Sequence, residues 1–352
     1  MGEKSLRVGI VGCGQIARES HIPALRKSKG VEIVAVCDTN ENLARRIANK
    51  LKINRAYADF TEMLRNEQPD VVNICTPPNT HSSLCIQAAE AGCHILVEKP
   101  MAPTAGDCEE MITAARNNQV SLGVVHNELF KPVVVAAISI VRRGDIGDLT
   151  GIAIQFSRGK DDDWIVNKDH WCHKLPGGIF CDILPHTIYL ALELLGGLEP
   201  VAVETRKFGS YGWMQMDELY MILKGANGLG TVISSCNWPK ETAIIDIFGT
   251  KVNLHIDIYN AVLTRYGHWG SGRPSRAIEN ISQSLQQVVC ILSTAMKKVL
   301  GRYHTGDYIC IQKFIESIRN NTLPPVTGED GWEVMRIFDK IVDKIEKPGP
   351  TE

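Results

Sequence analysis

The stretch LRVGIVGCGQIA, from Leu6 to Ala17, carries the strongest indication of the fold. Its first half is an apolar run that predicts a buried β-strand, and a GxGxxA turn follows directly at Gly12. Gly12 permits the tight turn, Gly14 lets a phosphate approach the backbone, and Ala17 is small enough for close packing of a helix on the strand. A strand, this turn and a helix in that order predict a dinucleotide-binding domain, with the phosphates at the helix N-terminus.

The second predicted strand, VEIVAVCD, ends in an acidic residue, as expected in a dinucleotide-binding domain. Asp38 stands 21 residues beyond Ala17, where a carboxylate accepts hydrogen bonds from a ribose and repels a 2′-phosphate. Arg45 and Arg46 lie further along the next helix, too far to hold such a phosphate. We therefore expect NAD rather than NADP as the cofactor.

The rest of the N-terminal third alternates short apolar runs with amphipathic stretches. Strands buried on both faces and linked by crossover helices have this pattern, so we expect a doubly wound, parallel α/β sheet of the Rossmann type. The strands are expected at Leu6–Gly12, Val31–Asp38, Asp70–Thr76, His94–Glu98 and Gln119–Val125, and the helices at Ile16–Ser28 (interrupted by Pro23), Glu41–Leu51 and Leu84–Ala91.

After about Asn127 the pattern changes. A helix over Lys131–Arg143 is followed by strands with short connections, which predicts an α+β domain on an open, mostly antiparallel sheet, closed by a helix over Gly331–Ile345. We expect domains at residues 1–128 and 129–352. The strands are expected at Leu149–Ser157, Pro200–Phe208, Glu218–Lys224, Gly230–Cys236, Ala243–Phe248 and Val252–Ile258.

Composition limits the kind of partner. The 352 residues exceed what one hydrophobic core usually organises, and a hydrophobic fraction of 44% argues against disorder. The net charge is −2, without a basic arm, so we expect a small-molecule substrate rather than nucleic acid. No apolar run reaches the roughly 18 residues that span a bilayer.

The cysteines and the N-terminus indicate the compartment. Eleven cysteines are spread from Cys13 to Cys310, and many lie in apolar runs where a free thiol packs as a small hydrophobe. The segment MGEKSLRVGIVG enters a strand without the pattern of a secretory signal. We expect a reducing compartment, the cytoplasm.

Two further motifs make the prediction more specific. TPPNTH, from Thr76 to His81, follows the strand DVVNIC, and Glu98-Lys99-Pro100 follows the strand HILV. Together with the glycine turn they resemble the Gfo/Idh/MocA family of oxidoreductases, and the resemblance extends to PPVTG before the last helix. That family includes inositol dehydrogenases, glucose–fructose oxidoreductase and nucleotide-sugar 3-dehydrogenases.

The resemblance implies where the cofactor binds. It places Lys99 near the nicotinamide and the substrate hydroxyl, and it suggests a cis bond between Lys99 and Pro100. The strand ends are also where an α/β domain places its ligand, and a lysine there is costly unless it is used or paired. The expected cofactor contacts are Gly12, Cys13, Gly14, Gln15, Ile16, Asp38, Thr76, Pro77, Asn79, His81, Glu98 and Lys99.

The second domain holds the rest of the expected catalytic set. In PGGIFCDILPH, Asp182 and His186 are four residues apart and share one face of a helix that continues to Leu195. Oxidation of an alcohol needs a base, and histidine titrates near neutral pH. Such a pair alone is usually structural, but the family motif GG-x-x-x-D-x-x-x-H falls on these residues. We expect Lys99, Asp182 and His186 to be catalytic, and Pro185 to lie in the helix's first turn.

Two neighbouring features have alternative readings. His170, Cys172, His173 and Cys181 suit zinc by residue type, but their spacing matches no common site and hydride transfer needs no metal. We expect no metal, and a substrate wall of Trp and His instead. The apolar positions from Ile281 to Val299 recur at helical spacing; we expect a core, lid or subunit contact there rather than a membrane-surface helix.

The expected function is NAD-dependent hydride transfer to or from a hydroxyl of a sugar, cyclitol or nucleotide-sugar. Two alternatives in the family are an NAD-dependent redox-assisted glycosidase and a non-catalytic NAD-binding regulator, but a regulator would be expected to lose Lys99, Asp182 and His186. The strands from Leu149 to Ile258 offer more apolar alternation than one layer of helices covers. We therefore expect a homodimer or homotetramer.

Overall fold

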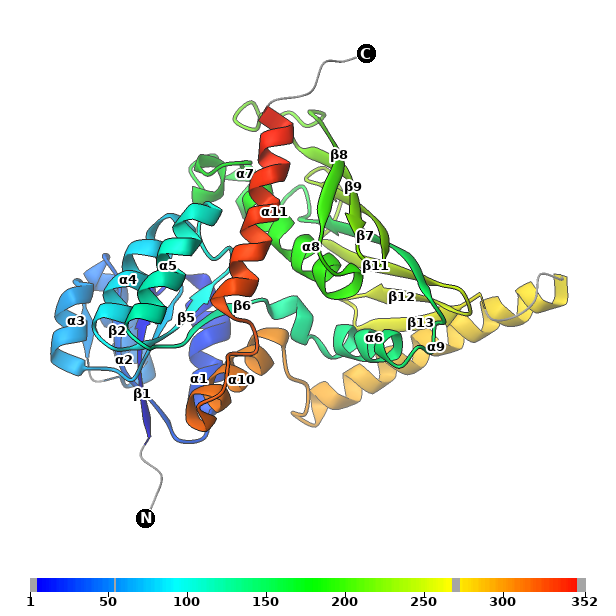
Figure 1. Ribbon diagram of the computed structural model, residues 1–352. Helices are drawn as coiled ribbons and strands as arrows, with labels where there is room; N and C mark the ends of the chain where they lie inside the picture. Colours follow the sequence, from blue (N-terminus) through cyan, green and yellow to red (C-terminus); the bar gives the residue numbers. More distant parts are fainter. Residues whose placement is uncertain (1–4, 54, 268–272, 347–352) are drawn as a thin grey trace. The chain divides into compact units, whose positions relative to one another are not determined.

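The computed structural model describes residues 5–53, 55–267 and 273–346 of the chain. These residues form two compact units (Figure 1). The first unit is Met1–Asn127 with Asp307–Arg336, and the second is Glu128–Gly306 with Ile337–Glu352. The C-terminal part of the chain therefore contributes to both.

The first unit is built on a six-stranded sheet in the order β3-β2-β1-β4-β5-β6. Every pairing in it is parallel, which confirms the Rossmann fold expected from the sequence. The strands that the sequence predicts are all present, and short β3 is an addition at the edge. The strands are β1 (Leu6–Val11), β2 (Val31–Cys37), β3 (Ala56–Tyr57), β4 (Val71–Ile74), β5 (His94–Glu98) and β6 (Leu122–Val125).

Helices cross over between these strands. The helix after the glycine turn opens with a π-helical segment that continues directly into an α-helix. Pro23 stands in the first turn of that α-helix, so the helix is irregular just before Pro23 but does not break there. Apolar periodicity did not predict α3, which buries only three side chains, or α5 and α10. The helical segments are η1 (Ala17–His21), α1 (Ile22–Lys27), α2 (Glu41–Leu51), α3 (Phe60–Glu67), η2 (Pro78–Thr80), α4 (His81–Glu90), α5 (Ala105–Asn117), α10 (Gly306–Asn320) and the first half of α11 (Gly328–Glu346).

The second unit is built on a seven-stranded sheet in the order β13-β12-β11-β7-β10-β9-β8. All its pairings are antiparallel except that of β7 with β10, which confirms the mostly antiparallel sheet. The edge strand β13 is an addition to those that the sequence predicts. The strands are β7 (Leu149–Ser157), β8 (Glu199–Arg206), β9 (Glu218–Gly225), β10 (Gly228–Ser235), β11 (Thr242–Gly249), β12 (Asn253–Asp257) and β13 (Val262–Tyr266).

The central helix of this unit is α8 (Phe180–Leu195), which packs against β7, β9 and β10 and buries 14 of its 16 residues. Pro185 lies inside α8, beyond its first turn, so the expectation that it opens the helix was wrong. The helix begins earlier because the Gly177–Gly178 turn starts it with short i to i−3 bonds at Phe180, Cys181 and Asp182. The other helical segments are η3 (Asn127–Phe130), α6 (Pro132–Arg142), α7 (Asp163–Val166), η4 (Trp171–Lys174), α9 (Arg273–Val299) and the second half of α11.

None of the helices in the described part of the chain combines the length and the apolar character needed to cross a membrane.

The packing of α10 against β6 yields a stability prediction. A β-carbon at Gly123 of β6 would lie 2.6 Å from Cδ2 of Phe314 on α10, closer than real contacts allow. We expect Gly123→Ala to destabilise the protein by about 1–3 kcal/mol, because a fully buried ring has to shift. Chemical denaturation measures this. The matched control is Gly106→Ala on α5, where a β-carbon meets nothing closer than 3.7 Å; equal stabilities of the two variants would contradict the prediction.

Candidate cofactor and substrate sites

The glycine turn that follows β1 is shaped by close contact with the end of β4. Gly12 has a φ of 89°, and a β-carbon there would lie 2.7 Å from the backbone carbon and oxygen of Cys75. Only glycine fits this position. A β-carbon at Gly14 would meet no atom within 4 Å, and Gly14, Gln15 and Ile16 are all exposed. The turn therefore faces open space with its backbone, as a phosphate-binding turn must.

Asp38 joins this turn to the end of β2. Its Oδ2 accepts a hydrogen bond of 2.8 Å from the backbone N–H of Cys13, and its Oδ1 accepts one of 2.8 Å from that of Asn40. The Cys13 thiol is buried, and burial with the nearby charge of Asp38 raises its pKa to about 12, so this residue contributes backbone rather than thiol chemistry. The open turn with a carboxylate beside it fits a dinucleotide, whose phosphates and ribose Gly12–Ile16 and Asp38 would hold.

His81 ties the TPPNTH loop to the EKP loop. Its ring is fully buried, with Nε2 2.7 Å from the carbonyl oxygen of Thr76 and Nδ1 3.1 Å from that of Met101. Burial lowers the pKa of His81. The structure thus places this ring inside the unit, between two loops, whereas Pro77 and Asn79 of the same loop are exposed. The Lys99–Pro100 bond is cis, which confirms that expectation.

A buried ion pair that the sequence reading missed holds Glu98. Nε2 of His21 lies 2.5 Å from Oε1 of Glu98, and its Nδ1 lies 3.0 Å from Oδ1 of Asn73. Burial opposes a charge on His21, but Cys75 and Glu98 outweigh it and raise the pKa of His21 well above its ordinary value. Oε2 of Glu98 accepts a hydrogen bond from the backbone N–H of Lys99. The pair therefore holds the backbone from which Lys99 projects.

His126 is the second residue of this unit that sequence reasoning missed. It follows β6 and is buried, and burial together with the positive charge of Lys99 lowers its pKa to about 3. The ring is therefore neutral at physiological pH, in the electrostatic field of Lys99.

In the second unit, Asp182 forms a buried ion pair. Nε and Nη2 of Arg158 donate hydrogen bonds of 2.8 and 2.6 Å to Oδ2 of Asp182, and both side chains are largely buried. Arg158 stands just beyond the end of β7, so the strand and α8 meet at this pair. The sequence did contain a signal for this pair: Arg158 directly follows an apolar strand, and a charge in such a place usually has a partner of opposite charge.

His186 lies one turn further along α8 and is held by different residues. Its Nδ1 lies 2.6 Å from the hydroxyl oxygen of Tyr189, and its ring stacks on Phe156 with centroids 5.1 Å apart. A histidine whose Nδ1 is fixed by a hydrogen bond has a defined ring orientation. The contact that orients His186 at Nδ1 thus comes from Tyr189, which sequence reasoning did not select.

The Trp and His residues upstream do gather into one cluster. Trp164 lies 4.2 Å from His170 and 5.2 Å from Trp171 between ring centroids, and the guanidinium of Arg158 stacks 4.0 Å from the Trp164 ring. Through Arg158 the cluster is continuous with Asp182. Nδ1 of His170 lies 3.1 Å from Sγ of Cys172, yet among the described residues no group of three or more side chains is arranged to hold a metal ion.

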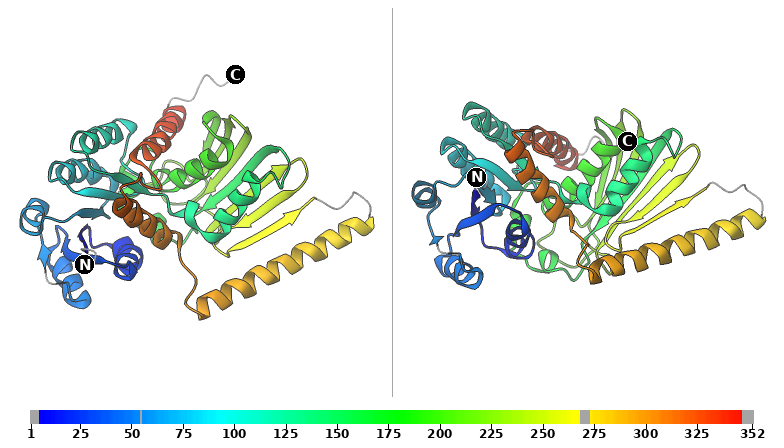
Figure 2. Two further views of the ribbon diagram at one scale, coloured as in Figure 1. Left: turned by 60° about the horizontal axis from the view of Figure 1, so that its bottom comes forward. Right: turned by 90° about the horizontal axis from the view of Figure 1, so that it is seen from below.

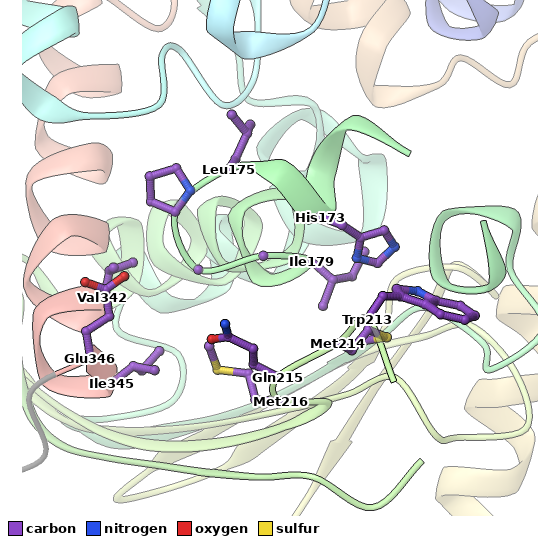
Figure 3. Close-up of a pocket in the computed structure, with 13 residues that line it drawn as sticks. His173, Leu175, Ile179, Trp213, Met214, Gln215, Met216, Val342, Ile345 and Glu346 are labelled. Atoms are coloured by element: carbon purple, nitrogen blue, oxygen red, sulfur yellow. The ribbon is translucent and has the colours of Figure 1, made fainter. Parts of the chain in front are cut away.

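A cavity of about 540 Å³ opens beside the Gly177–Gly178 turn that leads into α8. Figure 3 shows Ile345 and Glu346 of α11 on one side of it and His173 and Trp213 on the other. Neither Asp182 nor His186 lines it, so it meets α8 only through the turn.

Each unit thus brings together one half of the expected site. The first assembles the glycine turn, Asp38, the TPPNTH loop and Glu98–Lys99 along one sheet edge, because these segments follow β1, β2, β4 and β5. The second places Asp182 and His186 on α8. The meeting of Lys99 with His186 at one substrate hydroxyl stays a prediction.

Comparison with known proteins agrees with this architecture. Residues 6–126 match the model of an oxidoreductase family with an NAD-binding Rossmann fold (GFO_IDH_MocA), and residues 138–351 match that family's C-terminal alpha/beta domain. D-apiose dehydrogenase of Paraburkholderia graminis is 30% identical over 240 residues, which cover 68% of this chain and 62% of that protein. Myo-inositol 2-dehydrogenase of Thermotoga maritima is 25% identical over 341 residues, or 93% and 92% of the two chains.

The fold also matches a solved structure, the WlbA dehydrogenase from Bordetella pertussis in complex with NADH and UDP-GlcNAcA. The TM-score is 0.79 at 20% sequence identity, and the match covers 97% of each chain.

The low pKa of His126 yields a prediction about acid stability. Unfolded histidine titrates near 6.5, whereas the folded ring binds its proton only at about 3. As the pH falls through this window the unfolded state binds more protons, so stability is lost, by up to about 1.4 kcal/mol per pH unit from this ring. We expect His126→Gln to flatten the loss of stability between pH 6.5 and 3, as measured by denaturation at a series of pH values.

The control for this prediction is His255→Gln. Its hydrogen bond to Asp246 raises the pKa of His255, so its contribution to stability is present at low pH and is lost as the pH rises. Removing it cannot flatten the acid limb. Identical pH slopes for the His126 variant and the wild type would show that His126 is not buried neutral.

Proposed function

Since the chain belongs to the Gfo/Idh/MocA family of oxidoreductases, we propose that it is an NAD-dependent dehydrogenase that transfers a hydride to or from a hydroxyl of a sugar, cyclitol or nucleotide-sugar. The observation that carries this proposal is the group of side chains around α8: Arg158 pairs with Asp182 and stacks on the Trp164 ring, and His186 lies one turn further along α8, stacked on Phe156. Carboxylate, guanidinium and imidazole groups bind hydroxyls, and an indole packs on the apolar face of a sugar ring. The relatives named for D-apiose and myo-inositol support the same substrate class.

When bound, NAD supplies the carbon that accepts or gives up the hydride. The chain's own residues would hold it: the backbone of Gly12–Ile16 would face the phosphates, Asp38 would accept hydrogen bonds from the ribose, and Thr76, Pro77, Asn79 and Glu98 would border the cofactor. His81 contributes from within, by joining the two loops. Asp38 favours NAD over NADP because its charge repels a 2′-phosphate.

The proton is handled by His186 and Lys99. His186, fixed at Nδ1 by Tyr189, takes the hydroxyl proton through Nε2 during oxidation and returns it during reduction. Lys99 donates a hydrogen bond to the substrate oxygen and stabilises the charge that develops there. Asp182, paired with Arg158, accepts a hydrogen bond from a neighbouring hydroxyl of the substrate.

We also propose a cellular compartment and an oligomeric state for the protein. None of the eleven cysteines, all of which lie in the described residues, forms a disulfide, and ten are buried, which suits the reducing environment of the cytoplasm. The face of the second sheet that turns away from α8 exposes Tyr220, Ile222 and Leu229, with a neighbouring copy as the proposed cover in a homodimer or homotetramer.

A substrate panel tests the function. The protein is incubated with NAD and a series of sugars, cyclitols, nucleotide-sugars and chromogenic glycosides, while NADH absorbance and glycoside cleavage are followed together. A dehydrogenase forms NADH in proportion to product. Cleavage of a glycoside without net NADH would replace this proposal by a redox-assisted glycosidase, and NAD binding without either reaction across the panel would indicate a regulator.

Asp38 is expected to set the cofactor preference. We expect tighter binding of NAD(H) than of NADP(H) in fluorescence titrations, because Asp38 would face the 2′-phosphate without a basic partner. Asp38→Ser with Thr39→Arg should erode this preference, whereas Glu41→Ser with Thr39→Arg, which keeps Asp38, should preserve more of it. A wild-type preference for NADP would mean that Asp38 does not contact the ribose.

His186 and Lys99 are expected to act in turnover rather than in cofactor binding. On the substrate that the panel identifies, His186→Ala and Lys99→Ala should each lower kcat by about 10²–10⁴-fold, the usual contribution of a general base, while NAD affinity is retained. Tyr189→Phe should lower kcat less and shift its pH profile, because Nδ1 loses its partner. The control is His255→Ala, a half-exposed histidine on β12. Normal turnover of His186→Ala would rule out this assignment.

A further inference from the structure

Helix α9 covers the edge of the second sheet with its polar side. The side-chain amide of Gln286 makes two hydrogen bonds to the backbone of Arg265 on β13. Its Oε1 accepts one of 2.8 Å from the N–H of Arg265, and its Nε2 donates one of 3.2 Å to the carbonyl oxygen of Arg265. Sγ of Cys290 lies 3.5 Å from the carbonyl oxygen of Leu263, and Glu279 accepts a hydrogen bond from the N–H of Gly267. These bonds satisfy backbone groups that an edge strand would otherwise expose.

Most of the apolar side of α9 consequently faces away from its own sheet, and at one flank Ile281 and Leu285 border an open groove beside Leu263 of β13. Figures 1 and 2 show the helix running along β13 and on past the sheet. Ten large apolar side chains between Ile278 and Leu300 are exposed, by 47% to 84%. Six of them define what we call the α9 seam: Ile278, Ile281, Leu285, Val288, Leu292 and Val299.

The spacing of the seam indicates what kind of surface covers it. Its members, with Ala295 between the last two, follow one another at steps of three, four, three, four, three and four residues. This is the heptad pattern of a coiled coil, in which apolar residues repeat every 3.5 positions and pack into holes on a second helix. Val289, Ile291 and Met296 stand at the flanking positions of the same heptads, where a partner helix also makes contact.

The exposed area is close to what a stable dimer needs. An aliphatic side chain exposes roughly 100 Å² when free, so the six seam side chains present on the order of 370 Å² per copy, and Val289, Ile291 and Met296, which flank the seam, raise this to about 540 Å². That is at the upper end of the largest patches on ordinary monomers, about 300–600 Å², and approaches the roughly 800 Å² that each partner buries in a standard interface.

The charges favour a protein partner over a membrane. The charged residues of α9 stand near its two ends, up to Glu279 and again at Lys297 and Lys298, and from Asn280 to Met296 the chain carries none. Helices that lie on membranes usually carry Lys and Arg along their polar face. The polar face of α9 carries Ser and Gln instead, and it is turned to β13.

We propose that the α9 seam is a dimerisation surface, covered by the α9 seam of a second copy of this chain. Pairing of two identical seams around a two-fold axis buries both apolar surfaces at once, and each copy brings the heptad repeat that the other requires. This contact is separate from the outward face of the sheet and from the proposed catalytic groups, so it does not depend on the proposed function.

The test is the molar mass of the purified full-length protein at micromolar concentration, by light scattering and analytical ultracentrifugation. Leu285→Lys combined with Leu292→Lys places four buried charges in the paired seam, and we expect it to halve the mass of the wild type, whether that is a dimer or a tetramer. The matched control is Val135→Lys, an exposed valine on α6, which should keep the wild-type mass. NAD binding and circular dichroism show that each variant is folded.

A milder variant covers the case in which the lysines disturb folding. Leu285→Ala with Leu292→Ala should raise the dissociation constant of the dimer by roughly 10- to 100-fold. An unchanged mass and dissociation constant in the seam variants would overturn the proposal, and so would a monomeric wild type. A monomer that sediments with vesicles of phosphatidylcholine and phosphatidylserine through the seam would assign α9 to a membrane surface instead.

Discussion

The backbone of Gly12 lies so close to the end of β4 that no side chain fits between them. This contact fixes how β1 and β4, the two central strands of the first sheet, present their carboxyl ends. Because all six strands are parallel, the segments that follow β1, β2, β4 and β5 emerge at the same edge. The glycine turn, Asp38, the TPPNTH loop and Lys99 are neighbours for this reason.

Buried charge organises both halves of the candidate site. His21–Glu98 in the first unit and Arg158–Asp182 in the second are each largely buried. Such pairs contribute little net stability, because removing two charges from water costs about as much as their attraction returns. Their effect is positional: Glu98 holds the backbone of Lys99, and Asp182 is held beside Arg158 and the Trp164 ring. Both pairs therefore serve the geometry of the site more than the stability of the fold.

Helix α9 shows how edge protection creates a new surface. An edge strand exposes unpaired backbone groups that invite other strands. Gln286 and its polar neighbours occupy those groups on β13, so the apolar residues of the same helix are left facing outward. In an ordinary surface helix the apolar side faces the domain. In α9 the polar side faces the domain instead. The same orientation of the helix therefore covers the edge strand β13 and exposes the apolar surface that we propose to pair with a second chain.

Short sequence patterns by themselves determined the two sheets and the edge at which the cofactor is expected to bind. Apolar runs, the GxGxxA turn and Asp38 predicted the parallel sheet and its cofactor edge, and short connections predicted the antiparallel sheet, because each signal is contained in a few adjacent residues. Which side chains pair with one another was decided only by the tertiary structure. Arg158 pairs with a residue 24 positions away and His21 with one 77 positions away. Periodicity likewise predicted a helix around Ile281–Val299, but which of its faces is covered depends on β13. Such contacts follow from the order of strands in the sheets, which no local pattern in the sequence encodes.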